Sequence, residues 1–371
     1  MKIKSMKMPW RMTYTSLFMY GIVVTFLVRH LTDISFFGTT ALYFMMGIAA
    51  FAYAYLVFSE YRQLMRLLLF VDIIAGFDLL ANGNHNAFNA VVLLTAQVLG
   101  ILVYHNRKNL KLLDIVGILI ILYLTYKVTT TPKVLISSWQ YGIILSKLVW
   151  QNAVSIIIIE FLSFDLIYRL ECKKKVNYLI FAIALIVAII CDGIGGILSI
   201  SLFCIGVWIV NQKRNTLYWW KILLLATVVI IFLKTTDSWE KVIETLTDDN
   251  SRIYIWSCYI ECVDSIKAFL LGAAIDRNIY LMKMANMHNT VLNWHYNFGL
   301  IPLAFFLWML IVDFKYCIKT KNYTLLLIMC ITCLRAMTDE ASYSFMPIWT
   351  YVWIEANMRS RSRRIECEKN D

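Results

Sequence analysis

Long apolar stretches alternate along this chain with short polar or basic segments. Stretches of the length that crosses a bilayer as a helix, roughly 17–25 residues, occur about twelve times. They lie near 13–31, 37–58, 65–81, 87–104, 112–128, 148–168, 176–192, 195–211, 217–234, 294–314, 322–338 and 342–358. Lipid offers no water to backbone N–H and C=O groups, and the alternating pattern of an outer-membrane barrel is absent. The long apolar stretches therefore predict an all-α, polytopic bundle of membrane-spanning helices.

The basic residues indicate how such a bundle is oriented. About two thirds of the 35 Lys and Arg residues fall in the N-terminal segment, in alternate loops and in the C-terminal tail, which the positive-inside rule places in the cytoplasm. Both termini are therefore predicted to be cytoplasmic. The net charge of +11 follows from this topology, so we expect contact with membrane lipid and no nucleic-acid partner.

Composition supports this interpretation. The 371 residues are 60% hydrophobic and 16% charged, with a mean hydropathy of +0.66, which is too apolar for soluble domains. Only 4 Pro are present, which excludes a linker-rich chain. The nine cysteines form no disulfide framework, and Cys330 and Cys333 are expected to pack within a helix. Walker, GxGxxG and HExxH sequences are absent, so no cofactor is predicted.

The loop lengths divide the chain into four parts. Residues 1–234 are predicted to form about nine transmembrane helices, and 294–358 the last three. Between them, 235–293 is one long extracytoplasmic loop, and 359–371 is a basic cytoplasmic tail. Long loops in compact proteins usually carry function. We therefore expect the chemistry of the protein in the loop 235–293.

Within this loop the sequence predicts an amphipathic helix from Arg252 to Leu271, preceded by capping residues 249–251 and ended by Gly272. Its expected apolar face consists of Trp256, Tyr259, Ile260, Val263, Ile266 and Leu270. Such a helix lies on a membrane surface with an aromatic anchor near its start. The alternative is a lid that only covers the bundle.

Two residue types in the loop can do chemistry. Arg252 shares a helix face with Trp256, and an arginine at the apolar boundary is costly unless it meets an anion. His288 precedes the tenth span, and His295 follows two turns later; an imidazole there can accept a proton at neutral pH. Taken singly, each of these residues also fits a structural role.

Together these residues resemble the core signature of the O-antigen ligase/polymerase family, the Wzy-type membrane glycosyltransferases. The corresponding segments are Ser251-Arg252-Ile253-Tyr254-Ile255-Trp256, Leu271-Gly272-Ala273-Ala274, His288-Asn289-Thr290-Val291-Leu292 and Phe298-Gly299-Leu300. Two features depart from the family pattern. The usual Gly-x-Gly is reduced to one glycine, and the turn 191–196 lacks the arginine that members often carry there. A second cationic phosphate ligand must then come from elsewhere, and Arg277 and Arg335 are candidates that no motif fixes.

The resemblance implies a metal-independent polymerase that joins polyprenyl-diphosphate-linked oligosaccharide repeat units at the outer face of a bacterial cytoplasmic membrane, for O-antigen, capsule or exopolysaccharide. It implies Arg252 and His288 as catalytic residues, with His288 either accepting the proton of the attacking hydroxyl or orienting the diphosphate by hydrogen bonding. The implied substrate-binding residues are Trp256, Asn289, Arg277, Arg335 and His295. Donor and acceptor are both lipid-linked, and a flippase and a chain-length regulator are expected partners. The acidic pair Asp248-Asp249 precedes the predicted helix, where acids favour its dipole, and we expect no metal there.

Two alternatives stay open. A ligase that transfers the glycan to a different acceptor needs the same donor chemistry. A polytopic transporter, such as a lipid-linked oligosaccharide flippase, has a similar number of spans, but transporters usually show repeats with matched broken helices, which this sequence lacks. A cavity beneath the loop 252–288 favours transfer, whereas a central cavity favours transport.

Overall fold

The computed structural model describes residues 14–31, 36–81, 88–108, 110, 117–119, 121–123, 151–191, 194–211, 250–273, 287–339 and 341–368. Every regular element within these ranges is helical, which confirms the all-α prediction. The first four long helices are α1 (Tyr14–Leu31), α2 (Phe36–Val57), α3 (Arg62–Ala81) and α4 (Phe88–His105), with the 3₁₀ turn η1 (Ser59–Tyr61) before α3. The next group is α7 (Gln151–Glu171), α8 (Tyr178–Cys191) and α9 (Ile194–Asn211).

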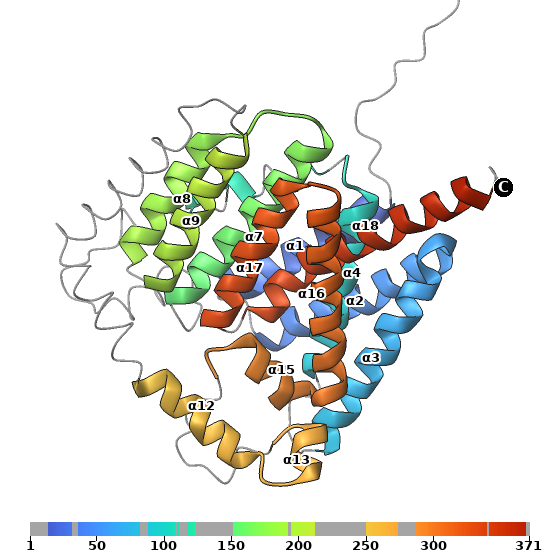
Figure 1. Ribbon diagram of the computed structural model, residues 1–371, viewed down its shortest axis with the longest axis vertical. Coiled ribbons are helices and arrows are strands. Elements are labelled where there is room, and N and C mark those ends of the chain that lie inside the picture. Colours follow the sequence, from blue (N-terminus) through green and yellow to red (C-terminus); the bar gives the residue numbers. More distant parts are fainter. Residues whose placement is uncertain are drawn as a thin grey trace, which may run out of the picture.

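The C-terminal part adds α16 (Leu300–Lys319), α17 (Tyr323–Thr338) and α18 (Ser342–Glu368), which pack with the earlier helices around one main core (Figure 1). Helix bounds lie within a few residues of the predicted spans, with two differences. The predicted span 294–314 is divided at Gly299, and α18 continues ten residues beyond its predicted end at 358. The span 217–234 lies outside the described residues, and 112–128 mostly does.

Gly299 explains the first difference. Its φ of +72° belongs to the left-handed region, and an added Cβ would lie 2.7 Å from both Asp78 Oδ2 and the Leu270 carbonyl oxygen. No other residue fits this position without strain. The chain therefore ends α15 (Thr290–Phe298) here and begins α16 in a new direction.

Most of the described basic side chains lie at helix ends on one side of the bundle. Arg107, after α4, pairs with Glu171 at the end of α7 at 3.4 Å, and Tyr351 of α18 donates to the same Glu171 at 3.1 Å. Among the described basic side chains, all but Lys267 and Arg335 lie within about one helical turn of this end. We call it the basic end; it consists of residues 57–62, 105–108, 171–175, 315–322 and 355–359.

The opposite end is covered by three short helices, α12 (Asn250–Cys262), α13 (Ile266–Leu271) and α15 (Figure 1). We call this the cap end. A second hydrophobic cluster holds the cap together; its buried members are Ile255, Cys258, Tyr259, Ala273 and Met287. Asn297 of α15 also accepts a hydrogen bond from Asn89 of α4 at 3.4 Å. The segment that the sequence assigned to the long outer loop thus folds onto the end remote from most of the basic residues.

The predicted single helix 252–271 is two helices. Ser265 starts α13, because its hydroxyl accepts a hydrogen bond from the Ala268 N–H at 3.1 Å and its own backbone is extended. Gly272 ends α13 with a φ of 92°, as predicted. The predicted face is wrong in part: Tyr259 is buried, but Ile260 and Ile266 are 64% and 80% exposed.

Few helices meet the length and apolarity needed to cross a membrane alone. Among the described residues, α16 qualifies by itself, and 41–57 qualifies together with 59–78, although that pair bends by 102°. Five further apolar helices are shorter than the required length. The all-helical architecture is therefore established, and the arrangement of twelve spans stays a prediction.

Candidate functional site

The start of α15 carries the predicted His-Asn pair. The Asn289 side chain caps the helix, because its Oδ1 accepts hydrogen bonds from the Val291 and Leu292 N–H groups at 2.9 and 3.2 Å. Its Nδ2 donates to the Met337 carbonyl of α17 at 3.3 Å. Asn289 thereby fixes the backbone next to His288, and its predicted contact with substrate stays a prediction.

His288 has a left-handed backbone, with a φ of 46°. Histidine occurs there more often than most residues, but the conformation still costs on the order of 1 kcal/mol compared with glycine. Thr290, two residues on, holds the segment in place: its hydroxyl donates to the Asp339 carbonyl at 3.0 Å and accepts from the Ala341 N–H at 3.1 Å. The surrounding contacts therefore impose the conformation of His288.

Asp339, at the end of α17, links the two predicted cationic residues. Its Oδ1 lies 3.4 Å from His288 Nδ1, and its Oδ2 lies 3.3 Å from Arg335 Nη2. A carboxylate beside Nδ1 favours the tautomer with a proton on that nitrogen and leaves the lone pair on Nε2. Asp339 is thus the residue that sequence reasoning did not place in the site, although its i, i+4 spacing from Arg335 was visible.

Arg335 is buried, with a side chain only 1% exposed, and is held from two further sides. Its Nε donates to Ser155 of α7 at 3.2 Å, and its Nη1 donates to Thr338 at 3.0 Å. The N-terminal turn of α9 lies beside it, since a Cβ on Gly195 would stand 3.8 Å from Arg335 Nη1. Arg335 therefore joins α7, α9 and α17 at the cap end.

Trp256 connects α12 to the same place. Its Nε1 donates to the Met287 carbonyl, one residue before His288, at 2.9 Å. Arg252 lies one turn earlier in α12, and residues four apart share a helix face. The Arg252 side chain lies outside the described residues, and so does the whole of Arg277. The structure thus brings Trp256, His288, Asn289 and Arg335 together.

His295 is separate from this group. Its Nε2 lies 2.8 Å from the Phe269 carbonyl, which can only accept, so this nitrogen carries the ring proton. Its Nδ1 then accepts from the Tyr259 hydroxyl at 2.8 Å, and burial raises the pKa of Tyr259, which keeps the phenol protonated. Both ring nitrogens therefore bind the protein, and a substrate contact through His295 would need one of these hydrogen bonds to break.

The sequence predicts a reaction that needs no metal ion. The acidic pair Asp248-Asp249 lies outside the described residues. Within the described part of the chain, no group of three or more His, Cys, Asp or Glu side chains is arranged to hold a metal ion. The groups that the cap end does bring together are a positioned imidazole and a buried guanidinium that share one carboxylate.

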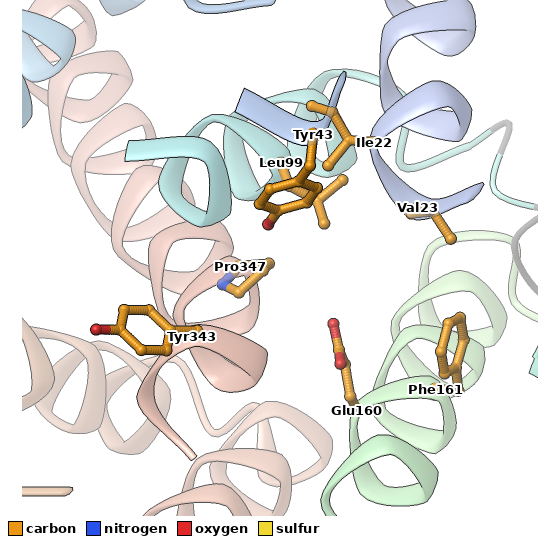
Figure 2. Close-up of a pocket in the computed structure, with 8 residues that line it drawn as sticks. All are labelled: Ile22, Val23, Tyr43, Leu99, Glu160, Phe161, Tyr343 and Pro347. Atoms are coloured by element: carbon orange, nitrogen blue, oxygen red, sulfur yellow. The ribbon is translucent and has the colours of Figure 1, made fainter. Parts of the chain in front are cut away.

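A small cavity lies away from these groups, in the interior of the bundle (Figure 2). Helices α1, α2, α4, α7 and α18 contribute its walls, and Glu160 of α7 is the acidic residue that lines it. Its volume is about 10 Å³, which is close to the minimum for one water molecule. This cavity is central, but it has no room for a sugar.

Comparison of the sequence and the structure with known protein families, characterised proteins and solved structures finds no significant match. The arguments for function therefore rest on the residues and their geometry.

Proposed function

We propose that this chain is a membrane polysaccharide polymerase that joins polyprenyl-diphosphate-linked repeat units at its cap end. The observation that carries the proposal is the left-handed His288, positioned by Asp339 and Arg335 next to the helix that bears Arg252. A strained backbone that many contacts impose is typical of functional sites. Glycan transfer needs a proton acceptor and cations for a diphosphate, and an imidazole and guanidinium groups have the chemistry for these two roles.

A membrane environment is supported by the outward face of α3. Large apolar side chains follow one another at helical spacing along this face and are all exposed; they are Leu67, Phe70, Ile73, Phe77 and Leu80. Helix α16 repeats the pattern with Ile301, Trp308, Ile311 and Ile318. Soluble monomers rarely expose apolar surface on this scale. Lipid contact explains such stripes of exposed apolar side chains.

The cap helices support contact with the membrane surface. Exposed apolar residues lie along two of them, α12 and α13, namely Ile253, Tyr254, Ile260, Ile266, Phe269 and Leu270. Charged Glu261, Asp264 and Lys267 are also exposed. A cap with exposed apolar and charged groups is typical of an interfacial element that rests in the headgroup region. A lipid-linked donor could then enter the site from the side of the bilayer.

The reaction assigns one role to each group. His288 Nε2 accepts the proton of the attacking sugar hydroxyl while its oxygen bonds to the anomeric carbon of the donor. The bond from that carbon to the diphosphate oxygen breaks, and the electron pair remains on the lipid diphosphate. Arg252 donates N–H groups to this growing negative charge. Asp339 stabilises the imidazolium that forms.

Arg335 is the better supported source of the second cation. It is linked to His288 through Asp339, and it lies beside Gly195, in the turn where the resembling family often carries an arginine. An arginine from α17 would then take the place of one from the α8–α9 turn. Its guanidinium already binds Asp339, so an arriving diphosphate would share it with that carboxylate.

The ligase and transporter alternatives predict different cellular products. Deletion of a polymerase gene leaves single repeat units attached to the acceptor, whereas loss of a ligase leaves finished polymer on its lipid carrier. Loss of a flippase leaves repeat units at the cytoplasmic face. The central cavity is too small for a sugar, so it gives no support to glycan transport.

The experiment is a gene deletion complemented with three chains: the natural one, Arg252→Ala and Lys267→Ala. We expect polymer with the first and third, and single repeat units with Arg252→Ala, because removing one donor of this kind costs about 10²–10³ in rate. Lys267 is a matched control, since it is a basic residue on the exposed side of the same cap. Normal polymer with Arg252→Ala at equal protein level would refute the proposal.

A further inference from the structure

The junction between α2 and α3 holds an arginine in a fixed position. The helix axis turns by 102° between 41–57 and 59–78, and Tyr55 lies in the last turn of α2 before this bend. Arg62, the first residue of α3, donates from Nε to the Tyr55 carbonyl at 3.0 Å and from Nη2 to the Leu56 carbonyl at 2.9 Å. Arg62 thereby satisfies two of the carbonyl groups that the end of α2 leaves without a helical partner.

Arg66 lies one turn further along α3 and is held by the same tyrosine. Its Nε donates to the Tyr55 hydroxyl at 2.9 Å. The guanidinium carbons of Arg62 and Arg66 each lie 5.9 Å from the centre of the Tyr55 ring. One aromatic residue therefore orders two cationic side chains that share a helix face, so less side-chain freedom remains to be lost when a ligand binds.

The hydrogen bonds of the two arginines do not neutralise their charges. The acceptors are two carbonyl groups and a phenol, which carry no net charge. Glu60 is the described acidic residue nearest to them in the sequence, and it can balance at most one of the two charges. Like charges four residues apart on a helix repel each other. An anion in contact with both guanidinium groups relieves this repulsion.

Exposed apolar side chains adjoin Arg66, which is itself exposed. Leu56 at the end of α2 is 71% exposed, and on the face of α3 that carries Arg66 the exposed residues Phe70, Ile73 and Phe77 follow at helical spacing. Helix α3 lies at the outer edge of the bundle (Figure 1). From Arg66 to Phe77 the helix rises about 16 Å, close to half of the roughly 30 Å hydrocarbon core of a bilayer. This stripe thus has the length of the acyl chains of one leaflet, with Arg66 at its headgroup end.

We propose that Tyr55, Arg62 and Arg66 form a binding site for the phosphodiester headgroup of an anionic phospholipid, whose acyl chains lie along the exposed stripe of α3. Guanidinium groups bind phosphate oxygens through paired N–H donors. The site belongs to the basic end, where basic residues and anionic lipids of the cytoplasmic leaflet attract each other. A bound lipid connects α2 to α3 at their bend. The inference rests on the membrane placement in the proposed function and does not depend on glycan transfer.

The first test measures lipid binding by the purified full-length protein in a neutral detergent. Native mass spectrometry with equal amounts of phosphatidylglycerol and phosphatidylcholine shows which lipid stays bound. We expect a preference for phosphatidylglycerol, and about fivefold weaker binding of that lipid in Arg66→Gln, the usual contribution of one basic residue near anionic lipid. Equal binding of the two lipids by the natural protein overturns the proposal.

Two further variants separate a built site from general attraction by charge. Tyr55→Phe keeps both arginines but removes the hydroxyl that holds Arg66, so it should also weaken the binding of phosphatidylglycerol. Lys175→Gln is the matched control, because it removes one exposed basic residue from the loop between α7 and α8 at the same end, and it should leave binding unchanged. Equal losses in Arg66→Gln and Lys175→Gln would show that only overall charge matters and would refute the site.

The acyl chains are tested with glycerophosphoglycerol, which is the headgroup of phosphatidylglycerol without its chains. At the same concentration as the lipid it should not displace bound phosphatidylglycerol, because the apolar stripe of α3 contributes to the affinity only when acyl chains are present. Displacement at equal concentration would assign the arginines to a free phosphate compound and contradict the proposed lipid site.

Reconstitution into vesicles distinguishes the lipid site from the membrane placement. The natural protein and Arg66→Gln are added to vesicles of phosphatidylcholine, with and without phosphatidylglycerol. We expect both proteins to insert, and phosphatidylglycerol to raise the melting temperature of the natural protein more than that of Arg66→Gln. Insertion with equal melting shifts would refute the lipid site alone. Failure of the natural protein to insert into either kind of vesicle would refute the membrane placement as well.

Discussion

The two ends of the bundle both contain left-handed residues that are not glycine, but for different reasons. Lys173 and Lys321 at the basic end each lie two residues past the end of a helix, α7 and α16 respectively. The N–H groups after them bond back to Arg169 and Cys317 at 2.8 and 3.0 Å, which is the hydrogen-bond pattern of the Schellman motif. Their conformation ends a helix and satisfies its last carbonyl groups.

His288 at the cap end has no such explanation. It precedes a helix, and the residue after it already provides the cap. Its left-handed backbone aims the ring at Asp339 and is kept by the contacts of Asn289 and Thr290 with α17. Strain without a role in folding is a stronger indication of function than strain that completes a helix.

The charge networks of the two ends differ in the same way. At the basic end Glu355 accepts from Tyr316 and pairs with Arg359, whose side chain is 57% exposed. At the cap end Asp339 is shared between a buried arginine and a histidine. Exposed pairs contribute little to stability, whereas breaking a buried pair leaves a charge without compensation.

The largest expected effect is on polymer formation, and it should differ between His288 at the cap end and His105 at the basic end. His288→Ala should lower polymer formation by about 10²–10⁴, the usual contribution of a positioned base. His105→Ala at the basic end removes a ring that stacks on Phe58 and should leave activity unchanged. Polymer length and rate, measured in the complemented deletion strain, check both. Equal losses would mean that the two ends do not differ in function.

The next effect concerns stability. Arg335→Met should lower the free energy of unfolding by about 3–5 kcal/mol, because the buried Asp339 then loses the guanidinium that compensates its charge. Arg359→Met removes an exposed partner and should cost at most about 1 kcal/mol. Thermal or denaturant unfolding of the two purified variants compares them directly. A similar small cost for both would show that Asp339 is more hydrated than its contacts indicate.

Most of the helical framework could be predicted from the sequence. Apolar runs located the long helices within a few residues, because packing against neighbouring helices requires a continuous apolar face. The breaks were harder to foresee. Gly299 is a single glycine in an apolar run, which by itself does not predict a helix end. The division at Ser265 depends on its side chain capping a new helix, and a serine in a short polar stretch occurs equally often in a simple turn.

The sequence named the residues of the candidate site but not how they pair. His288, Trp256 and Asn289 came from one short region, and the structure places them together with Arg335. The link through Asp339 depends on how α17 ends against α15, which no local pattern determines.

A smaller effect tests the structural role of His295. Tyr259→Phe removes the hydroxyl that donates to His295 Nδ1 and leaves a buried acceptor without its partner. We expect a loss of about 1–3 kcal/mol in the free energy of unfolding, with polymer formation retained in proportion to folded protein. Loss of activity at full stability would instead support the predicted contact of His295 with substrate.

The smallest effect isolates the backbone strain at the two ends. Glycine adopts a left-handed φ freely and alanine does not, so His288→Gly should be more stable than His288→Ala by about 1 kcal/mol. The pair Lys321→Gly and Lys321→Ala should show the same difference, because Lys321 has a similar φ. Chemical unfolding of the four variants measures this difference.

Activity distinguishes the two positions: both variants at 321 should remain active, and both at 288 should not. If glycine gave no advantage at 288, the left-handed conformation would not be a source of strain there, and the strongest contrast between the two ends would be lost.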